Sequence, residues 1–330
     1  MNSKKIIQNK NFFVSRKGFL FEQEIVINNS CDENCLFCSI DVKAKDNQRI
    51  FSFQLPEIIN KLKMQKLISD SIKLTGGEPT LHPKLSEIIK NARSIGFTDI
   101  CIETNGQNFS NEAFSQKIVE AGANRFFISI HGHTAALHEK LTRTKKSFQK
   151  TVQGIKNLKK IGAFVNAHVV INKINYKHIA DIVEFLSDLG VPLITLSFIT
   201  ISGAVLKNKK IIPKIGDVVK YARQINKKYL PRVILQHIPF CFLGELNCVN
   251  KWIKYEDKNI LYTASYKITF ERLADSFGYK PKKCSRCKFD NICYGLDKGY
   301  YKLFGSREIK LQPGVKFKNY EDYENGTSGH

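Results

Sequence analysis

The sequence has no run of 18 or more apolar residues, whereas a helix that crosses a membrane needs about 20. Its first ten residues are polar and basic and lack the apolar segment of a secretory signal peptide. These two absences argue against an integral membrane protein and against a protein secreted through a signal peptide. We therefore expect a cytoplasmic protein that has no membrane partner.

The sequence also lacks internal repeats of solenoid period and segments of low complexity. Hydrophobic residues make up 42% of its 330 positions, which is enough for a sizeable core. We expect a globular chain with one large α/β domain and a smaller C-terminal domain.

Acidic residues are few. Aspartate and glutamate number 30 against 52 lysines and arginines, so the formal net charge is +22. The basic residues are spread along the chain, with short groups at 207–210 and 280–283, and no aromatic pattern of an RNA-binding module accompanies them. A solvated basic surface is the first interpretation. A docking surface for an acidic electron donor, such as flavodoxin or ferredoxin, is the second, and RNA binding is the third.

Apolar segments of strand length alternate with amphipathic segments of helical period between residues 22 and 235. The predicted strands are 24–27, 71–74, 99–103, 125–130, 163–171 and 193–199. The predicted helices are 56–69, 84–95, 112–121, 148–161, 176–189 and 214–228. This alternation predicts a parallel sheet, because each right-handed crossover returns the chain to the same sheet.

Polar segments follow the first four predicted strands. Ligands of parallel sheets bind at the carboxyl ends of the strands, so we expect these segments to share one mouth. Their candidate site residues are Cys31, Cys35, Cys38, Gly76, Gly77, Glu78, Thr104, Asn105, Ser129 and His131.

Nine cysteines, most of them in local groups of a chain without a signal peptide, predict metal ligation in place of disulfides. Three of them, Cys31, Cys35 and Cys38, are spaced Cys-x3-Cys-x2-Cys. Three thiolates can hold three irons of a 4Fe-4S cluster and leave the fourth iron open to a small molecule. The alternative is half of a zinc site, although structural zinc prefers a closed tetrahedron of four protein ligands.

Together with the segment Thr75-Gly76-Gly77-Glu78-Pro79, the cysteine spacing resembles the radical S-adenosylmethionine (SAM) superfamily. The resemblance covers roughly two-thirds of the chain and implies a partial (β/α)6 barrel. It implies that the open iron chelates the amino and carboxylate groups of SAM. An electron from the cluster would then split the sulfonium and release a 5'-deoxyadenosyl radical, which takes a hydrogen atom from an unactivated C–H bond.

The resemblance also implies which groups face SAM. Phe37 would pack near the adenine, the carbonyls of Gly76 and Gly77 would bind the ammonium group, and Glu78 would support that turn. The other candidates are polar side chains for the ribose and methionine parts, a guanidinium for the carboxylate and two residues of an adenine pocket. They are Thr104, Asn105, Ser129, His131, Arg143, Leu196 and Phe198.

Several of these assignments have a plain structural alternative. Asn105 precedes a glycine and suits a turn, and Arg143 could be solvated on a loop. Leu196 and Phe198 could be ordinary strand core.

Three histidines, His131, His133 and His138, make a histidine-rich loop. We interpret this loop as a wall of the site or as surface, because the sequence offers no further ligand at metal spacing for all three.

A second group of cysteines lies in the C-terminal third. Four thiolates can close a cubane, so this group predicts an auxiliary 4Fe-4S cluster held by Cys241, Cys284, Cys287 and Cys293. Cys248 would be left over or would exchange with Cys241. A zinc ribbon with four cysteine ligands is the alternative.

The Cys-x2-Cys-x5-Cys spacing of this group resembles the SPASM/twitch extension of radical SAM enzymes. That pattern continues with a fourth cysteine after three residues, where this chain has Asp297. The resemblance therefore implies a shortened, twitch-like domain with one auxiliary cluster, which could accept an electron from a substrate radical.

We expect the radical SAM core at residues 1–235, the auxiliary-cluster domain at 236–320 and a flexible tail at 321–330. The expected activity is that of a radical SAM oxidoreductase or maturase that oxidises or cross-links a peptide. One alternative is the oxidation or rearrangement of a small metabolite or nucleotide. The other is a non-enzymatic basic zinc-ribbon protein that binds RNA. Substrate, acid and base residues and oligomeric state are not predicted by the sequence.

Overall fold

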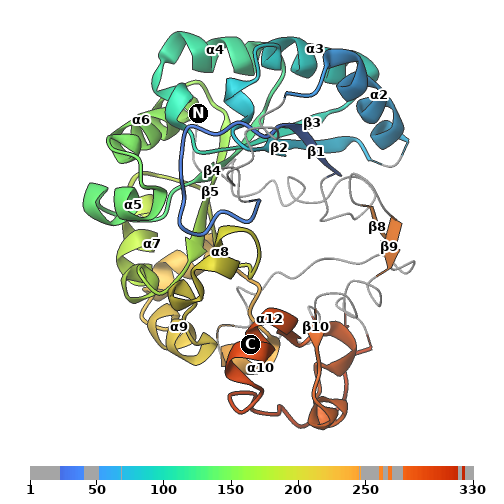
Figure 1. The fold of residues 1–330 in the computed structure, drawn as a ribbon, viewed down its shortest axis with the longest axis vertical. Coiled ribbons are helices and arrows are strands. Elements are labelled where there is room, and N and C mark those ends of the chain that lie inside the picture. The colour runs from blue at the N-terminus through green and yellow to red at the C-terminus, as the bar shows by residue number, and fades with distance from the viewer. Residues whose placement is uncertain are drawn as a thin grey trace.

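The structure is a computed structural model of the chain. It describes residues 23–40, 52–67, 69–244, 246, 260–262, 267–269, 278–318 and 322–323. Cys248 and most of the predicted tail at 321–330 lie outside the described residues. A curved row of strands with helices along its outer side forms the larger part, and the C-terminal segments pack at one end of it (Figure 1).

Seven strands form one parallel sheet whose order follows the sequence. They are β1 (Gln23–Asn28), β2 (Ser71–Gly76), β3 (Asp99–Thr104), β4 (Arg125–Ser129), β5 (Phe164–Ile171), β6 (Leu193–Phe198) and β7 (Val233–Gln236). In the part of the chain that the structure describes, β1 and β7 do not pair with each other, so the barrel is open.

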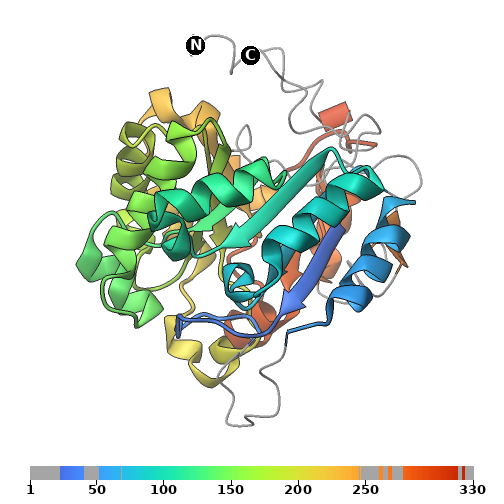
Figure 2. The same cartoon turned by 90° about the horizontal axis from the view of Figure 1, so that it is seen from above.

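Helices stand between the strands along the chain, and most of them lie as a layer over the sheet when the molecule is viewed from above (Figure 2). They are α2 (Leu55–Lys66), α3 (Leu85–Ile95), α4 (Glu112–Glu120), α5 (Ala135–Thr142), α6 (Ser147–Lys160), α7 (Ile179–Asp188), α8 (Ala204–Lys207) and α9 (Ile215–Ala222). Two further helices, α10 (Phe240–Leu243) and α12 (Lys298–Phe304), follow β7 and belong to the C-terminal part (Figure 1). Within the described ranges, no helix is long and apolar enough to cross a membrane.

The two faces of the sheet differ because successive side chains of a strand point to opposite sides. One face carries fully buried aliphatic residues such as Leu74, Ile102 and Leu196, which belong to the same core as Leu62 of α2 and Ile88 of α3. Side chains of the opposite parity, from the same strands, include charged and polar groups such as Lys73 and Ser197 beside apolar ones such as Phe127. The sheet therefore has an apolar face toward the helices and a mixed concave face that carries charged and polar groups.

The predicted partial barrel is confirmed, and all six predicted strands are present. Strand β7 was missed, because it has only four residues and follows a 3-10 helix, Lys227–Arg232, that contains Pro231. That 3-10 helix begins after the cap residue Asn226, and α9 ends at Ala222, so the helix predicted at 214–228 is too long. Helix α5 was also missed.

The C-terminal region contains the two-stranded sheet of β10 (Gly278–Tyr279) and β11 (Leu296–Asp297), followed by α12. Tyr300 of α12 joins this region to the larger sheet, because its ring packs edge-to-face on Phe198 and its hydroxyl accepts the backbone N–H of Ile215 at 2.9 Å. Strands β8 (Ile260–Tyr262) and β9 (Lys267–Thr269) form a separate antiparallel pair. The last strand of the large sheet ends at Gln236, next to the predicted domain boundary at 235.

Candidate active site

The first cysteine group lies on the loop that leaves the carboxyl end of β1. Cys31, Cys35 and Cys38 are each partly buried there, and the carbonyl of Cys35 accepts the N–H of Cys38 at 3.3 Å. Burial raises the pKa of the Cys31 thiol to about 12, and burial together with the charges of Glu33 and the other two cysteines raises that of Cys35. Thiolates are costly in such a place unless bound metal offsets their charge, so this loop suits metal ligation.

The turn after β2 lies directly against this cysteine loop. The N–H groups of Gly77 and Glu78 donate to the carbonyls of Asn28 and Ser30, at 3.0 and 2.6 Å. A Cβ atom on Gly76 or Gly77 would overlap those same carbonyl groups, and Gly76 has a φ of 138°. The glycines thus permit a close approach, as the sequence predicted, but the partner seen is the cysteine loop itself.

Replacing Gly77 with alanine is expected to displace the cysteine loop, because the new methyl group would overlap the Ser30 carbonyl. We expect the Gly77→Ala protein to lose about 2–4 kcal/mol of stability. It should also lose iron from the first cysteine group, as measured by thermal unfolding and iron content. The matched control is Gly162→Ala, where nothing lies within 4 Å and only the left-handed φ of 80° costs about 1–2 kcal/mol. Wild-type iron content in the Gly77 variant would contradict this account.

Glu78 is a buried hub that connects the ends of β1, β2 and β3. Its carboxylate accepts Thr80 N–H at 3.0 Å, Thr80 Oγ1 at 2.6 Å, Thr104 Oγ1 at 2.7 Å and Asn105 N–H at 2.7 Å. Its carbonyl accepts Asn28 Nδ2 at 3.0 Å. Burial raises the pKa of this carboxyl, and the four donors oppose the rise. The predicted supporting role of Glu78 fits this geometry.

Thr104 and Asn105 also serve this internal network. The Thr104 hydroxyl donates to Glu78 and accepts the N–H of Gly106 at 3.0 Å. Asn105 Nδ2 donates to Asp32 Oδ1 at 2.6 Å, within the cysteine loop. Their buried side chains therefore position the loop, and a contact of either with the ribose or methionine of SAM stays a prediction.

Glu33, between Cys31 and Cys35, was missed by the sequence analysis. It is 5% exposed and lies within hydrogen-bond distance of two side chains: Cys35 Sγ at 3.2 Å and Gln107 Nε2 at 3.2 Å. Burial raises the pKa of this carboxyl to about 8. The sequence contains no signal that a residue between two cysteines of this motif is buried. Acidic side chains are rarely buried, so Glu33 stands out only once its position in the folded structure is known.

The carboxyl end of α5 holds the other side of the cysteine loop. The N–H groups of Asn34 and Leu36 donate to the carbonyls of Thr142 and Leu141, at 3.0 and 2.9 Å. Arg143, with a φ of 53°, ends the helix and donates from Nε to the Asn34 carbonyl at 2.7 Å. Arg143 is therefore exposed to solvent and also bound to the loop, and its predicted pairing with the SAM carboxylate stays a prediction.

Phe37 and His131 face each other across the mouth. Their rings meet edge-to-face with centroids 4.5 Å apart. His131 Nδ1 accepts the Val170 N–H at 3.2 Å, and the His131 N–H donates to His138 Nδ1 at 3.1 Å. Burial lowers the pKa of both imidazoles, that of His138 to about 4. The His131 imidazole is thus neutral, and its role as a wall of the site stays a prediction, as does the contact of Ser129, which ends β4, with SAM.

Leu196 and Phe198 lie on the apolar face of β6. Leu196 is 0% exposed and Phe198 3%, and Phe198 contacts Tyr300. This packing agrees with the alternative interpretation, ordinary strand core. The part of this region that reaches the mouth is the following loop, where the N–H of Ala204 donates to the Cys38 carbonyl at 2.9 Å.

The concave face of the sheet carries a polar array that the sequence analysis missed. Lys73 pairs with Glu24 at 2.7 Å and with Glu103 at 3.1 Å, and Arg125 pairs with Asp99 at 2.7 Å. Strand alternation in the sequence contained this signal, since these charged residues of β1 to β4 all have the parity that points away from the apolar face.

His168, Ser197 and Gln236 continue this array along β5, β6 and β7. His168 Nε2 lies 2.9 Å from Ser197 Oγ, which lies 3.0 Å from Gln236 Oε1. Burial lowers the pKa of His168 to about 3, so its imidazole is neutral. The array provides hydrogen-bonding groups for a substrate at the concave face.

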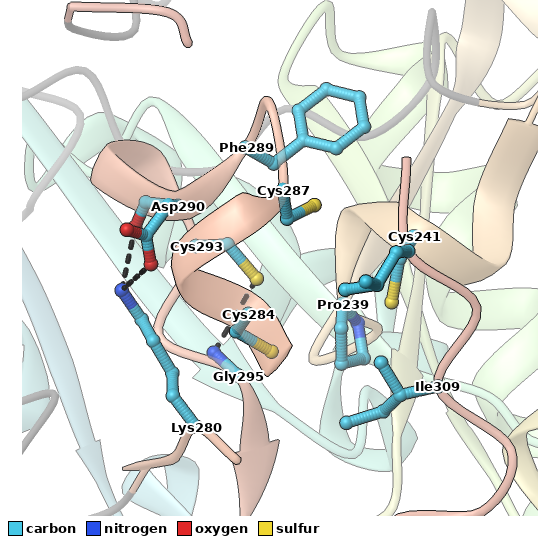
Figure 3. A pocket seen from close by; sticks show the side chains of 11 residues that line it. Pro239, Cys241, Lys280, Cys284, Cys287, Phe289, Asp290, Cys293, Gly295 and Ile309 are labelled. Atoms are coloured by element: carbon cyan, nitrogen blue, oxygen red, sulfur yellow. Dashed lines mark hydrogen bonds and ion pairs between the residues drawn. The ribbon is translucent and has the colours of Figure 1, made fainter. Parts of the chain in front are cut away.

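The second cysteine group gathers at one pocket of the C-terminal region. Four thiol side chains line it, together with Lys280 and Asp290 (Figure 3). They are Cys241, Cys284, Cys287 and Cys293. Burial and the neighbouring cysteines raise the pKa of the Cys284 thiol to about 11 and also that of Cys241, so this pocket too is suited to bound metal.

Asp297, which stands where a fourth cysteine of the SPASM pattern would be, has a structural role. Its carboxylate accepts the Tyr300 N–H at 2.9 Å and so caps α12. The fourth cysteine that lines the pocket instead comes from α10 and is Cys241.

The family model described as "Radical SAM superfamily" matches residues 25–186, which contain the cysteine loop and the strand ends described above. A protein of Saccharolobus islandicus named "Probable GTP 3',8-cyclase" is 28% identical over 225 residues, covering 66% of this chain and 71% of that protein. A protein of the same name from Methanocaldococcus jannaschii is 31% identical over 176 residues, covering 53% and 58%.

Solved structures share the fold at low identity. Streptococcus suis SuiB bound to precursor peptide SuiA has a TM-score of 0.57 and 17% identity, covering 89% of this chain and 75% of that chain. The enzyme anSMEcpe with bound AdoMet and Cp18Cys peptide has a TM-score of 0.60 and 12% identity, covering 93% and 96%.

Proposed function

The chain is a radical SAM enzyme, and from this premise we propose that it oxidises or cross-links a peptide with the help of an auxiliary iron-sulfur cluster. The observation that carries the proposal is the presence of two separate cysteine groups, one on the loop after β1 and one at the C-terminal pocket. The first would hold the SAM-binding 4Fe-4S cluster through Cys31, Cys35 and Cys38.

When bound, that cluster supplies one electron to SAM, whose cleavage yields a 5'-deoxyadenosyl radical that takes a hydrogen atom from the substrate. The residues of the chain fix the geometry. Glu78 and the turn after β2 hold the cysteine loop from one side, and the end of α5 with Arg143 holds it from the other. Phe37 and His131 exclude water from their side of the cysteine loop, because both are buried and in contact.

The pocket lined by Cys241, Cys284, Cys287 and Cys293 would hold the auxiliary cluster. Its four thiols can ligate all four irons of a 4Fe-4S cluster, so no iron is left open to a substrate. This number therefore favours a cluster that transfers an electron over one that binds substrate. Zinc with four cysteine ligands is the competing occupant of the same pocket. An electron donor of acidic character would suit a chain with a net charge of +22.

Replacing Cys241 with alanine is expected to weaken the auxiliary cluster, because three thiols remain at the pocket and leave one of its irons without a protein ligand. The iron content after anaerobic reconstitution and gel filtration should fall below the value of about eight per chain expected for the wild type. Cys248→Ala is the matched control, and it should keep about eight irons. If the Cys248 variant loses iron and the Cys241 variant does not, Cys248 is the fourth ligand and Cys241 is not. If the protein contains zinc and no auxiliary iron, the pocket is a zinc site and not a cluster site.

The charges of the concave face favour a peptide over a nucleoside triphosphate. Strands β1 to β7 carry two lysine or arginine side chains, Lys73 and Arg125, and both are paired with carboxylates. A triphosphate needs cations that are not already neutralised. The second candidate function is nonetheless a nucleotide rearrangement, because the sequence relatives carry the name GTP 3',8-cyclase.

The test is an anaerobic assay of the reconstituted protein with SAM and dithionite, followed by detection of 5'-deoxyadenosine. We expect this product, and its absence from fully reconstituted, reduced protein would refute the proposed activity and favour the zinc-ribbon alternative. Peptides encoded beside the gene and GTP are then compared as substrates. A peptide that loses two hydrogen atoms supports the proposal, whereas conversion of GTP alone would replace it with the second candidate.

A further inference from the structure

Three side chains from two neighbouring loops converge at the rim of the sheet, outside both cysteine groups. His133 lies on the loop between β4 and α5, whereas His178 and Asp181 lie at the start of α7, after β5. Strands β4 and β5 are paired, so the two loops leave the same edge of the sheet side by side. The sequence analysis found no partner for His133, because its neighbours lie 45 or more residues further along the chain.

The donor atoms of these three residues are close together. One ligand atom from each of His133, His178 and Asp181 lies within 4.8 Å of the other two. His178 Nδ1 is 3.3 Å from Asp181 Oδ2, and the rings of His133 and His178 have centroids 5.5 Å apart. Two ligand bonds of about 2.0–2.1 Å at a tetrahedral angle place the donor atoms about 3.4 Å apart. The pair His178 and Asp181 already has this separation.

His133 provides a second, independent observation. Its Nδ1 atom is buried and has no hydrogen-bond partner among the described residues. A buried ring nitrogen without a partner is costly, and a metal ion within reach would satisfy it. The side chains of His178 and Asp181 are 45% and 56% exposed, so they can rotate to close the remaining distance without repacking the core.

We propose that His133, His178 and Asp181 bind a divalent transition-metal ion, with zinc as the best fit. Two imidazoles and one carboxylate form a donor set for zinc and for similar first-row ions, whereas calcium and magnesium prefer oxygen ligands alone. Three protein ligands leave a fourth position for water. The site has no cysteine, so it is separate from both iron-sulfur positions.

The ion would fasten the loop of His131 to the start of α7. Asn175 Nδ2 already donates to the His131 carbonyl at 3.1 Å, and so joins the same two loops from the inside. A metal ion would add a second connection on the outside. Since His131 contacts Phe37, the metal site would stabilise one wall of the mouth.

The experiment uses the full chain with its iron-sulfur clusters reconstituted anaerobically, titrated with zinc chloride by calorimetry. We expect His178→Ala and Asp181→Asn to weaken zinc binding by at least about a hundredfold, more than the loss of an outer-shell group costs. Zinc should also raise the unfolding temperature of the wild-type protein, and not that of either variant. The iron content is measured before and after each titration.

Two control variants match these changes on the same element. Lys177→Ala truncates the exposed neighbour of His178, and Asp188→Asn removes the same charge from the last turn of α7. Both should bind zinc as the wild type does. Equal zinc uptake by all four variants and the wild type, with or without release of iron, would overturn the proposal, as would the absence of zinc binding to the wild-type protein.

Discussion

The protein in which Cys31, Cys35 and Cys38 are all replaced with alanine is expected to form no 5'-deoxyadenosine and to retain about four irons per chain. The first result follows because no other described cysteine lies on the loop after β1. The second follows because Cys241, Cys284, Cys287 and Cys293 gather at a separate pocket. Iron and sulfide analysis of the reconstituted protein, with the SAM cleavage assay, checks both.

Cys101→Ala is the matched control for this triple variant. Cys101 is fully buried within β3, and burial raises the pKa of its thiol, so it belongs to neither group. Its replacement should retain about eight irons and SAM cleavage at a modest cost in stability. An iron content near zero in the triple variant would contradict the auxiliary cluster, and product formation by that variant would contradict the assignment of the SAM-binding cluster.

Replacing Glu78 with alanine is expected to destabilise the protein by about 3–5 kcal/mol, because it leaves four donors without an acceptor in a buried position. At about 2–4 °C per kcal/mol for a domain of this size, the unfolding temperature should fall by about 10 °C. The first cysteine group should lose iron as well, because the Glu78 carboxylate holds the backbone of Asn105, whose side chain binds Asp32 of the cysteine loop.

Two further variants locate the cause of this effect. Glu78→Gln keeps one acceptor oxygen but turns an amide group toward N–H and O–H donors, so it should lie between wild type and alanine. Glu112→Gln removes an exposed carboxylate that pairs with Lys160, and it should change stability by less than about 1 kcal/mol. A Glu78→Ala protein as stable as the Glu112 variant would show that the network does not hold the strand ends together.

The sequence predicted the parts of the fold that depend on period and length. Alternating apolar segments predicted six strands. The helix predicted at 84–95 corresponds to α3, which ends where Gly96 adopts a left-handed conformation. The four-residue strand β7 and the short helix α5 were not predicted, because neither contains enough residues to show a hydrophobic period. Their existence depends on packing against a sheet that the rest of the chain forms.

The sequence predicted where the candidate site lies in the fold, but not which residues contact one another there. The cysteine loop, Gly77 and Glu78 meet at the strand ends as expected, because parallel strands place their carboxyl ends at one edge. What the sequence could not reveal is that Asn105 and Arg143 bind the cysteine loop itself. Contacts between segments far apart in sequence leave no local signal.

The alternation of side chains along a strand explains why Leu196 and Phe198 lie in the core and not at the expected adenine pocket. Leu196 and Phe198 were expected near the adenine because they end β6, but every second residue of a strand faces the helices. Thr195 and Ser197 point to the other side, where Ser197 lies near His168 and Gln236. The polar residues of β6 were therefore the better candidates for contact with a ligand.

The anchoring of the cysteine loop has a consequence for how the enzyme is made in the cell. Ser39 of that loop accepts a hydrogen bond from Ser202, 163 residues later in the chain. At roughly 5–20 residues per second, a ribosome needs about 8–30 s to synthesise the intervening segment. For much of that interval the three thiols lack their later anchors, so they are open to oxidation and to the wrong metal. We therefore expect stable cluster insertion to follow synthesis of the sixth strand and its loop, and expression under slow translation or in air should yield chains with a damaged first cysteine group.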